Sequence, residues 1–325
     1  MKVFLTGASG CIGHYIADTL MRETEHELFL FVRNRNKLQL DLEYRGGINV
    51  VEGDLRDIGN YQSLLKTIHV AILTAAAWGG EEEARTINVE KTKEAIALLS
   101  PEVCQQVIYF STASILSPNN QLLPEAKELG TDYIRTKYEC CEELKQLAIA
   151  NKITKVFPTL VFGGDETKPY SHLSGGLPDI IKWINLVKWF RADGSFHFIH
   201  GRDIATVVKY LLENPPAPSS PWGNKLVLGN TPLTANQAIE EMCSYLGKKI
   251  YFRFPLSLWL ANIFIGVFSI QVAAWDRFCM NNPHFTYQHY VNPASFGLTP
   301  YCSSIADVLE VTGIPHNNEQ LTMNN

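Results

Sequence analysis

The chain of 325 residues lacks several features that would assign it to a class of protein at once. Its seven cysteines are odd in number and none stand at metal-ligand spacing, so we expect free thiols in a reducing cytosol and no metal. There is no excess of basic residues, and the net charge of −5 disfavours nucleic acid as the main partner. There is no internal repeat, and the first expected strand begins at residue 2. The sequence therefore leaves no room for a targeting peptide and predicts a cytoplasmic protein.

A glycine-spaced turn stands near the N-terminus. Residues 2–6 form an apolar stretch typical of a buried strand. Gly7, Gly10 and Gly13 follow at three-residue intervals and lead into a helical stripe of apolar residues. Gly7 allows a sharp turn, Gly10 leaves the backbone open to a pyrophosphate, and Gly13 lets helix and sheet pack closely. This order of strand, turn and helix predicts a dinucleotide-binding α/β unit with phosphates at the helix N-terminus.

A second constellation is Tyr-Ile-Arg-Thr-Lys at 133–137. The pattern predicts a helix that begins near residue 131 or 132, with a buried stripe of Ile134, Tyr138, Cys141, Leu144 and Ala148. Tyr133 and Lys137 lie one turn apart on this helix. Free tyrosine has a pKa of about 10. Because a neighbouring ammonium favours the phenolate, we expect Lys137 to lower the pKa of Tyr133 and to fit it for proton transfer.

Together these segments resemble the extended short-chain dehydrogenase/reductase family, which is NAD-dependent epimerase/dehydratase-like, over nearly the whole chain. The matching segments are Thr6–Gly13, Gly53–Asp57, Leu73–Ala77, Asn88–Thr92, the Tyr133/Lys137 pair, Pro158–Gly163 and Phe198–Ala205. The resemblance implies an α/β fold, a Rossmann-type doubly wound parallel sheet with a smaller, discontinuous α+β substrate-binding portion. It also implies an enzyme with a nicotinamide cofactor and a small-molecule substrate.

The resemblance further implies a catalytic set of Thr112, Tyr133 and Lys137. Thr112 follows the apolar strand 107–111 and stands three residues before the tripeptide Ile-Leu-Ser, where the family has its catalytic Ser or Thr. Its hydroxyl would bond the substrate oxygen while Tyr133 exchanges the proton, and Lys137 would also hold the nicotinamide ribose. Ser111 would lie beside the cofactor and Ser114 too far along. The alternative for Thr112 is a strand-end hydroxyl that caps local backbone.

The choice of cofactor is read from the end of the second strand. The apolar stretch 28–32 ends in Arg33-Asn34-Arg35-Asn36-Lys37, without the carboxylate that accepts the ribose 2′-hydroxyl of NAD. Arg33 and Lys37 suit a 2′-phosphate instead, so the sequence predicts NADP rather than NAD. The other residues that the resemblance places at the cofactor are Gly7, Ser9, Gly10, Cys11, Ile12, Gly13, Asp54, Leu55, Ala75, Ala76, Asn88, Ser111, Tyr133, Lys137, Pro158, Leu160 and Val161.

Strands and helices are expected to alternate through the first half of the chain. The predicted strands lie near 2–6, 27–32, 48–52, 69–74, 106–111, 153–161 and 224–229. We expect the NADP-binding Rossmann domain to comprise residues 1–163 and 196–230. The substrate-binding portion is expected at 164–195 and 231–325.

The substrate prediction depends on what stands at the expected diphosphate position. Sugar-nucleotide enzymes of the family carry an arginine there, whereas this chain has Phe196, although Arg191 and Arg202 are near enough in sequence to substitute. The substrate segments are rich in tryptophan and phenylalanine, which favours an apolar ligand. The first hypothesis is an NADP-dependent oxidoreductase acting on a carbonyl, alcohol or activated alkene of a lipophilic or ring-containing molecule. A nucleotide-sugar epimerase or dehydratase and a non-catalytic dinucleotide sensor stay open as alternatives.

Residues 256–275 carry no charge. The stretch is long enough to span a bilayer, but its polar residues favour a buried helix or pocket wall, with peripheral membrane contact as the alternative. The sequence also leaves a homodimer open.

Overall fold

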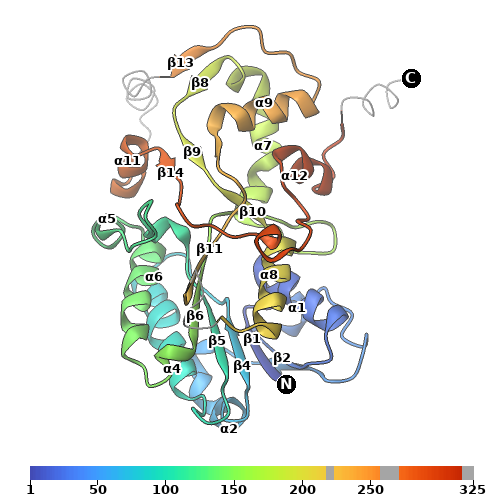
Figure 1. Cartoon of the computed structure of the whole chain (residues 1–325), viewed down its shortest axis with the longest axis vertical. Helices are drawn as coiled ribbons and strands as arrows, with labels where there is room; N and C mark the ends of the chain where they lie inside the picture. Colours follow the sequence, from blue (N-terminus) through green and yellow to red (C-terminus); the bar gives the residue numbers. More distant parts are fainter. Residues whose placement is uncertain (217–222, 257–270, 317–325) are drawn as a thin grey trace.

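Seven strands form the central sheet of the computed structural model, which describes residues 1–216, 223–256 and 271–316 (Figure 1). Their spatial order is β11-β6-β5-β4-β1-β2-β3, and all neighbours are parallel. The bounds are β1 (Lys2–Thr6), β2 (Glu27–Val32), β3 (Ile48–Glu52), β4 (Val70–Leu73), β5 (Gln106–Phe110), β6 (Ile153–Pro158) and β11 (Lys225–Leu228). The strand order reverses between β1 and β4, where such sheets bind dinucleotides at their carboxyl edge. The predicted Rossmann-type fold is confirmed.

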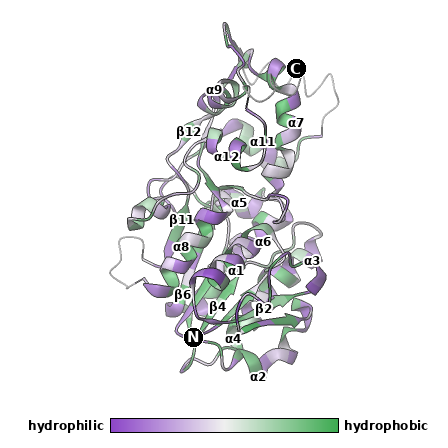
Figure 2. Ribbon diagram, turned by 90° about the vertical axis from the view of Figure 1, so that its right-hand side faces the viewer, coloured by the Kyte–Doolittle hydropathy of each residue, from purple (hydrophilic) through white to green (hydrophobic). Residues whose placement is uncertain are grey.

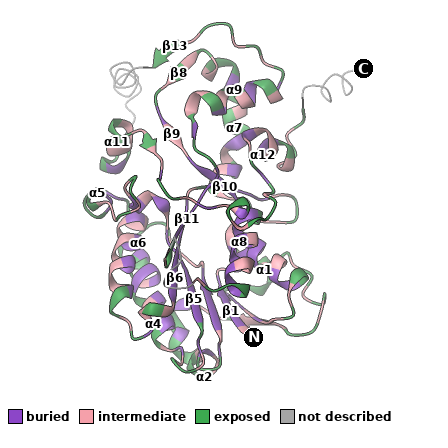
Figure 3. Ribbon diagram, in the orientation of Figure 1, coloured by how far each residue is buried: buried purple, intermediate pink, exposed green. Residues whose placement is uncertain are grey.

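Each strand is buried on both faces because helices cover both sides of the sheet. Val3 and Leu5 pack with α1 (Cys11–Glu23) and α8 (Gly201–Glu213). Phe4 points to the other side, where α2 (Gln62–Leu65), α4 (Thr92–Ala97) and α6 (Asp132–Glu143) lie. Figure 2 shows the apolar strands between these helices, and Figure 3 shows them buried.

The remaining elements gather beyond the carboxyl edge of the sheet (Figure 1). Small sheets form there from β7 (Leu160–Phe162) with β10 (Phe198–His200), from β12 (Leu233–Thr234) with β9 (Ser195–Phe196) and β14 (His284–Phe285), and from β13 (Phe254–Leu256) with β8 (Phe190–Ala192). The helices there are α5 (Pro124–Glu128), α7 (His172–Val187), α9 (Ala235–Tyr245), α11 (Ala274–Asn281) and α12 (Ile305–Val311), whereas α3 (Glu81–Arg85) lies beside α6 (Figure 2). Residues of α7, α9 and α12 share a separate apolar core.

Helix α6 begins where the sequence predicted. Thr131 is its N-cap, and the threonine side chain accepts a hydrogen bond from the main-chain N–H of Ile134. The α-helix ends at Glu143 and continues as one 3-10 turn, so Ala148 lies outside the helix and is exposed. The predicted buried stripe is therefore wrong at Ala148.

The predicted strand 153–161 is two strands. The main-chain N–H of Thr159 donates to the carbonyl of Leu228 in the main sheet, whereas that of Leu160 donates to His197. The chain therefore leaves the central sheet after Pro158 and enters the small sheet of β7 and β10. The chain after β6 thereby joins the elements that lie beyond the carboxyl edge of the central sheet.

The apolar stretch 256–275 falls mostly on residues 257–270, which lie outside the described residues. Its two ends are described: Leu256 closes β13, and Trp275 is buried in α11. Among the described residues, no helix combines the length and the apolar character needed to cross a membrane.

Candidate active site

The turn between β1 and α1 is fixed by contacts that leave no room for side chains. Gly7 has a φ of +73°, and a Cβ there would lie 2.7 Å from Oγ1 of Thr74 and 2.8 Å from the main-chain nitrogen of Ala75. A Cβ on Gly13 would lie 2.2 Å from the carbonyl oxygen of Gly7. Oγ1 of Thr74 donates to the carbonyl of Thr6 at 2.6 Å. The glycine turn is thus held against the loop that follows β4.

The N-terminus of α1 has the character of an anion site. Gly10 is the N-cap in extended conformation, and among residues 1–216 no side chain caps this end and no acid stands in its first turn. A Cβ on Gly10 would meet the carbonyl of Gly7 at 3.4 Å, so the exposed Gly10 leaves the backbone approachable. The main-chain N–H groups of the first turn point to where a pyrophosphate would sit. The predicted segment from Ser9 to Gly13 therefore fits a dinucleotide.

The ends of β2 and β3 carry the predicted adenosine-side residues. Arg33 and Lys37 are exposed, and among the described residues neither has an ion-pair partner. Asp54 accepts from the main-chain N–H of Arg56 at 2.8 Å and pairs with its guanidinium at 3.6 Å. Leu55 is buried in the core beside this loop. The structure thus places two unpaired cations next to the edge of the nucleotide site.

Asn88 is held between the loop after β4 and α6. It lies in the π-helical segment Thr86–Lys91 and is fully buried. Its amide donates to the carbonyl of Ala77 at 2.8 Å and to Oγ1 of Thr136 at 2.9 Å, and its oxygen accepts from the N–H of Ala77 at 2.8 Å. Both amide protons are therefore committed within the protein. Asn88 therefore joins the loop after Ala75 and Ala76 to α6, and its contact with the cofactor stays a prediction.

Tyr133 and Lys137 lie on the side of α6 that meets the carboxyl edge of the sheet. Nζ of Lys137 donates to the carbonyl of Phe110 at 2.8 Å and lies 5.8 Å from the centroid of the Tyr133 ring. The side chain of Thr112 lies close enough to the phenol of Tyr133 to lower its pKa, against the effect of burial. The structure therefore brings the three predicted catalytic residues together.

The pKa of Tyr133 is shifted in the opposite direction from the prediction. Burial raises it, although the nearby hydroxyl of Thr112 opposes the shift. Lys137 is also buried, which lowers the pKa of its ammonium to about 8. At neutral pH Tyr133 therefore keeps its proton, and Lys137 is mainly protonated.

The hydroxyls of Ser111 and Thr112, which follow β5, have different partners. The buried Ser111 accepts a hydrogen bond from the thiol of Cys141 at 3.3 Å, which joins the end of β5 to α6. Oγ1 of Thr112 accepts from the N–H of Ser114 and donates to its hydroxyl, both at 3.3 Å. Thr112 thus combines the local cap with the contact to Tyr133.

Trp78 is a site residue that the sequence reasoning missed. Its indole stacks on the ring of Tyr133, with centroids 4.2 Å apart and planes at 14°, and meets His172 at the start of α7 edge-on at 4.6 Å. More than half of Trp78 is exposed. An aromatic residue between three alanines and two glycines was the available signal. Trp78 gives the phenol an aromatic wall that remains open to solvent.

The residues predicted to contact the cofactor at the end of β6 and in β7 differ in exposure. Pro158 is buried, Leu160 is exposed and Val161 is half-buried. The neutral ring of His197 accepts from the N–H of Tyr287 at 3.0 Å and donates to the carbonyl of Asn230 at 2.6 Å. Since the Tyr287 hydroxyl donates to Ala113, these contacts hold the C-terminal part of the chain beside Thr112.

The segment Phe198–Ala205 is structural. Buried Asp203 accepts from the N–H groups of Tyr301 and Cys302 at 2.6 and 3.1 Å, while burial raises the pKa of its carboxyl to about 6. His200 caps α8, and burial lowers its pKa to about 4. These groups join the central sheet to the elements beyond its carboxyl edge.

Arg191 and Arg202 are the two candidates to replace the family's diphosphate-binding arginine. Arg202 already contacts another side chain, and Arg191 lies far from α6. The guanidinium of Arg202 lies on the ring of Tyr301, 4.4 Å from its centroid. Arg191 lies on β8, at the end of the molecule away from α6 (Figure 1). Half-buried Phe196 stands at the expected arginine position.

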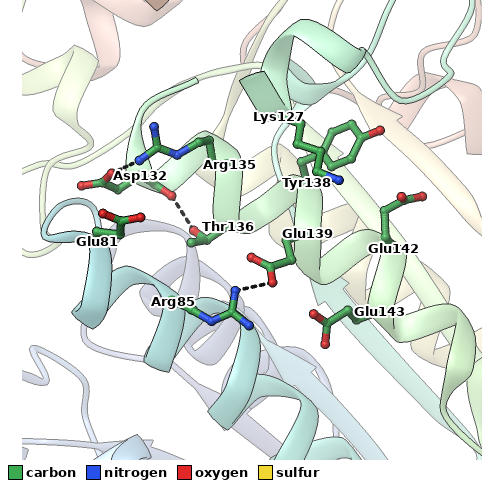
Figure 4. A pocket seen from close by; sticks show the side chains of 10 residues that line it. All are labelled: Glu81, Arg85, Lys127, Asp132, Arg135, Thr136, Tyr138, Glu139, Glu142 and Glu143. Carbon is green, nitrogen blue, oxygen red and sulfur yellow. Dashed lines mark hydrogen bonds and ion pairs between the residues drawn. The ribbon is translucent and has the colours of Figure 1, made fainter. Parts of the chain in front are cut away.

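A charged cleft of about 450 Å³ opens between α3 and α6, on the other side of α6 from Tyr133 (Figure 4). Its two arginines are neutralised: Arg85 pairs with Glu139, and Arg135 pairs with Asp132. Because the carboxylates already hold these guanidinium groups, the cleft offers no unpaired arginine to an anionic substrate.

Comparison with known proteins supports the fold. A model of the NAD dependent epimerase/dehydratase family matches residues 3–224, and the chain belongs to that family. The predicted resemblance is confirmed, and membership indicates a short-chain dehydrogenase/reductase type of enzyme that uses a nicotinamide dinucleotide. Among curated proteins no match is found.

Solved structures agree on the fold at low sequence identity. The structure described as gox2253 has a TM-score of 0.70 and 19% identity, covering 96% of this chain and 98% of its own. The nucleoside-diphosphate-sugar epimerase PA4631 from Pseudomonas aeruginosa has a TM-score of 0.66 and 14% identity, covering 100% of this chain and 98% of its own. The dTDP-glucose 4,6-dehydratase from Bacillus anthracis, in complex with NAD, has a TM-score of 0.63 and 12% identity, covering 98% of this chain and 97% of its own.

The position of Asn88 generates a testable prediction. Asn88→Ala should reduce the free energy of unfolding by about 1–3 kcal/mol, because it leaves buried partners unsatisfied. It should also weaken cofactor binding, since it frees the loop after Ala76. Denaturant unfolding and cofactor titration measure both effects. Asn214→Ala, which removes one exposed bond to Tyr210, is the control. Equal stability of the two variants would contradict the role of Asn88.

Proposed function

We propose that this protein is an NADP-dependent oxidoreductase. It transfers a hydride between the nicotinamide and a carbonyl or alcohol, or an activated alkene, of a lipophilic, ring-containing small molecule. The observation that carries the proposal is the exposed indole of Trp78 stacked on Tyr133. An aromatic surface beside the proton donor favours a flat or cyclic apolar group over a sugar diphosphate.

The residues of the site support carbonyl reduction. Bound nicotinamide would supply the hydride. Tyr133 holds its proton because burial raises its pKa, so it can donate that proton to a substrate oxygen. Thr112, which lies beside the phenol, would orient the same oxygen. The ammonium of Lys137, held by the carbonyl of Phe110, would stabilise the phenolate that remains.

The proposed preference for NADP depends on the end of β2. Arg33 follows the last residue of that strand, where a carboxylate would select NAD. Arg35 and Lys37 lie in the following short helix and add positive charge. A guanidinium without an ion-pair partner among the described residues suits a phosphate. The localisation we propose remains the cytoplasm.

A second candidate is a nucleotide-sugar epimerase or dehydratase, because two of the similar structures carry such names. The occupied Arg202, the distant Arg191 and the phenylalanine at 196 weigh against it. An intact Tyr133/Lys137 pair weighs against the non-catalytic sensor.

A substrate panel tests the proposed function. Cyclic apolar ketones should consume NADPH, while UDP- and dTDP-sugars should neither bind at micromolar concentration nor form epimers. Trp78→Ala should reduce the preference for cyclic over open-chain ketones by about two- to tenfold, the worth of one aromatic contact. The controls are Trp183→Ala, an exposed tryptophan away from Tyr133, and the unmutated protein. Micromolar UDP-sugar binding that is lost in Arg191→Ala or Arg202→Ala would overturn the proposal.

Tyr133 and Lys137 give distinguishable kinetic signatures. Tyr133→Phe should lower kcat about 10²–10⁴-fold with little change in cofactor affinity. Lys137→Met should lower both kcat and the affinity for the cofactor. Because burial lowers the pKa of Lys137 to about 8, kcat/KM for reduction should fall as pH rises through that value. Thr112→Val should damage turnover more than Ser114→Ala. A greater effect of Ser114→Ala, or a rate constant unchanged well above pH 8, would contradict these roles.

Cofactor titration tests Arg33. NADPH should bind more tightly than NADH, and Arg33→Ala should remove about ten- to a hundredfold of that preference, since one charge-assisted contact is lost. Arg22→Ala is the control, because that exposed arginine pairs with Asp18 on α1. Equal dissociation constants for NADPH and NADH in the unmutated protein would contradict the NADP preference.

A further inference from the structure

Large apolar side chains are exposed together at the end of the molecule farthest from the central sheet. Tyr251 is 78% exposed and Trp183 is 62% exposed. We define the aromatic tip as Trp183, Leu186, Trp189, Tyr251, Phe252 and Phe254, all of which are exposed. Figure 1 places β8 and β13 at this end, and Figure 3 shows β13 exposed. An apolar group of this kind marks an interaction surface.

The two segments of the aromatic tip are joined by backbone contacts. The N–H of Phe254 donates to the carbonyl of Trp189 at 2.7 Å, and β13 pairs with β8 in register Phe254 to Phe190. The rings of Phe252 and Phe254 meet edge to face at 4.6 Å. The tip is therefore an ordered part of the fold, with its side chains directed to solvent.

Basic residues outnumber acids around the aromatic tip, although the exposed Asp193 lies beside Arg191 and Leu256. Residues 180–192 and 248–256 contain Lys182, Lys188, Arg191, Lys248, Lys249 and Arg253 and no acid, in a chain whose net charge is −5. Two of these cations have partners just outside the ranges: Lys182 pairs with Asp179, and Arg253 pairs with Glu240, both at 2.7 Å. No ion pair involves the other four among the described residues. Aromatic side chains within a basic border are typical of proteins that bind the interface of an anionic bilayer.

We propose that the aromatic tip docks on an anionic lipid membrane. Tryptophan, tyrosine and phenylalanine would enter the headgroup region, while the lysines and Arg191 meet lipid phosphates and carboxylates. A second copy of the chain is a poorer occupant, because a two-fold interface would bring the same cations face to face. The site comprises only the described residues, and it stands independently of the proposed catalytic function.

Vesicle sedimentation tests the proposal with the full-length protein. Binding to phosphatidylcholine vesicles that contain phosphatidylserine should exceed binding to pure phosphatidylcholine and should weaken with added salt. Lys248→Gln with Lys249→Gln should reduce the partition coefficient about thirtyfold. Tyr251→Glu should reduce it about tenfold or more. Tyr44→Glu, at an exposed tyrosine of the loop after β2, is the matched control and should bind as the unmutated protein does.

Thermal unfolding of each variant shows whether it is folded. A folded Tyr251→Glu protein that binds vesicles as the unmutated protein does overturns the proposal. Equal loss in Tyr44→Glu and Tyr251→Glu also overturns it. So does a dimer that dissociates in Tyr251→Glu while vesicles do not bind. Binding of a single-stranded oligonucleotide in place of vesicles would assign the tip to nucleic acid and would contradict the lipid proposal.

Discussion

The close approach of the glycine turn to the loop after β4 is the constraint on which the site depends. A Cβ on Gly13 would overlap the carbonyl of Gly7, and a Cβ on Gly7 would overlap Ala75. From Ala77 the contacts continue through the buried amide of Asn88 to Thr136, the residue before Lys137. Backbone and amide groups thus link the glycine turn after β1 to helix α6, which carries Tyr133 and Lys137.

Burial gives the same site its acid character. The phenol of Tyr133 lies between the hydroxyl of Thr112 and the indole of Trp78, and the loss of water raises its pKa. The buried ammonium of Lys137 is kept in place by the carbonyl of Phe110. A protonated phenol with a cation nearby is suited to give a proton to an oxygen atom, and the proposed carbonyl reduction rests on this property.

The sequence predicted the strands, the glycine turn and the Tyr/Lys pair because each depends on local spacing. The predicted strand 153–161 could not show the break after Pro158, since the break depends on partners at Leu228 and His197, distant along the chain. The role of Asn88 was likewise hidden, because Thr136 approaches it only in the fold. The direction of the Tyr133 pKa depends on burial, which residue spacing does not measure. Trp78 was missed because its stacking partner comes from another element.

The central claim is that the site carries out net hydride transfer to a substrate carbon and releases oxidised cofactor. The most direct measurement uses NADPH deuterated at nicotinamide C4, in each of its two stereochemical forms, with a cyclic ketone substrate, and follows the label by mass spectrometry. The account predicts that deuterium from one form appears on the former carbonyl carbon, with one oxidised cofactor released per product. Product formed without net cofactor oxidation, with the nicotinamide retained and recycled as in an epimerase, would contradict it.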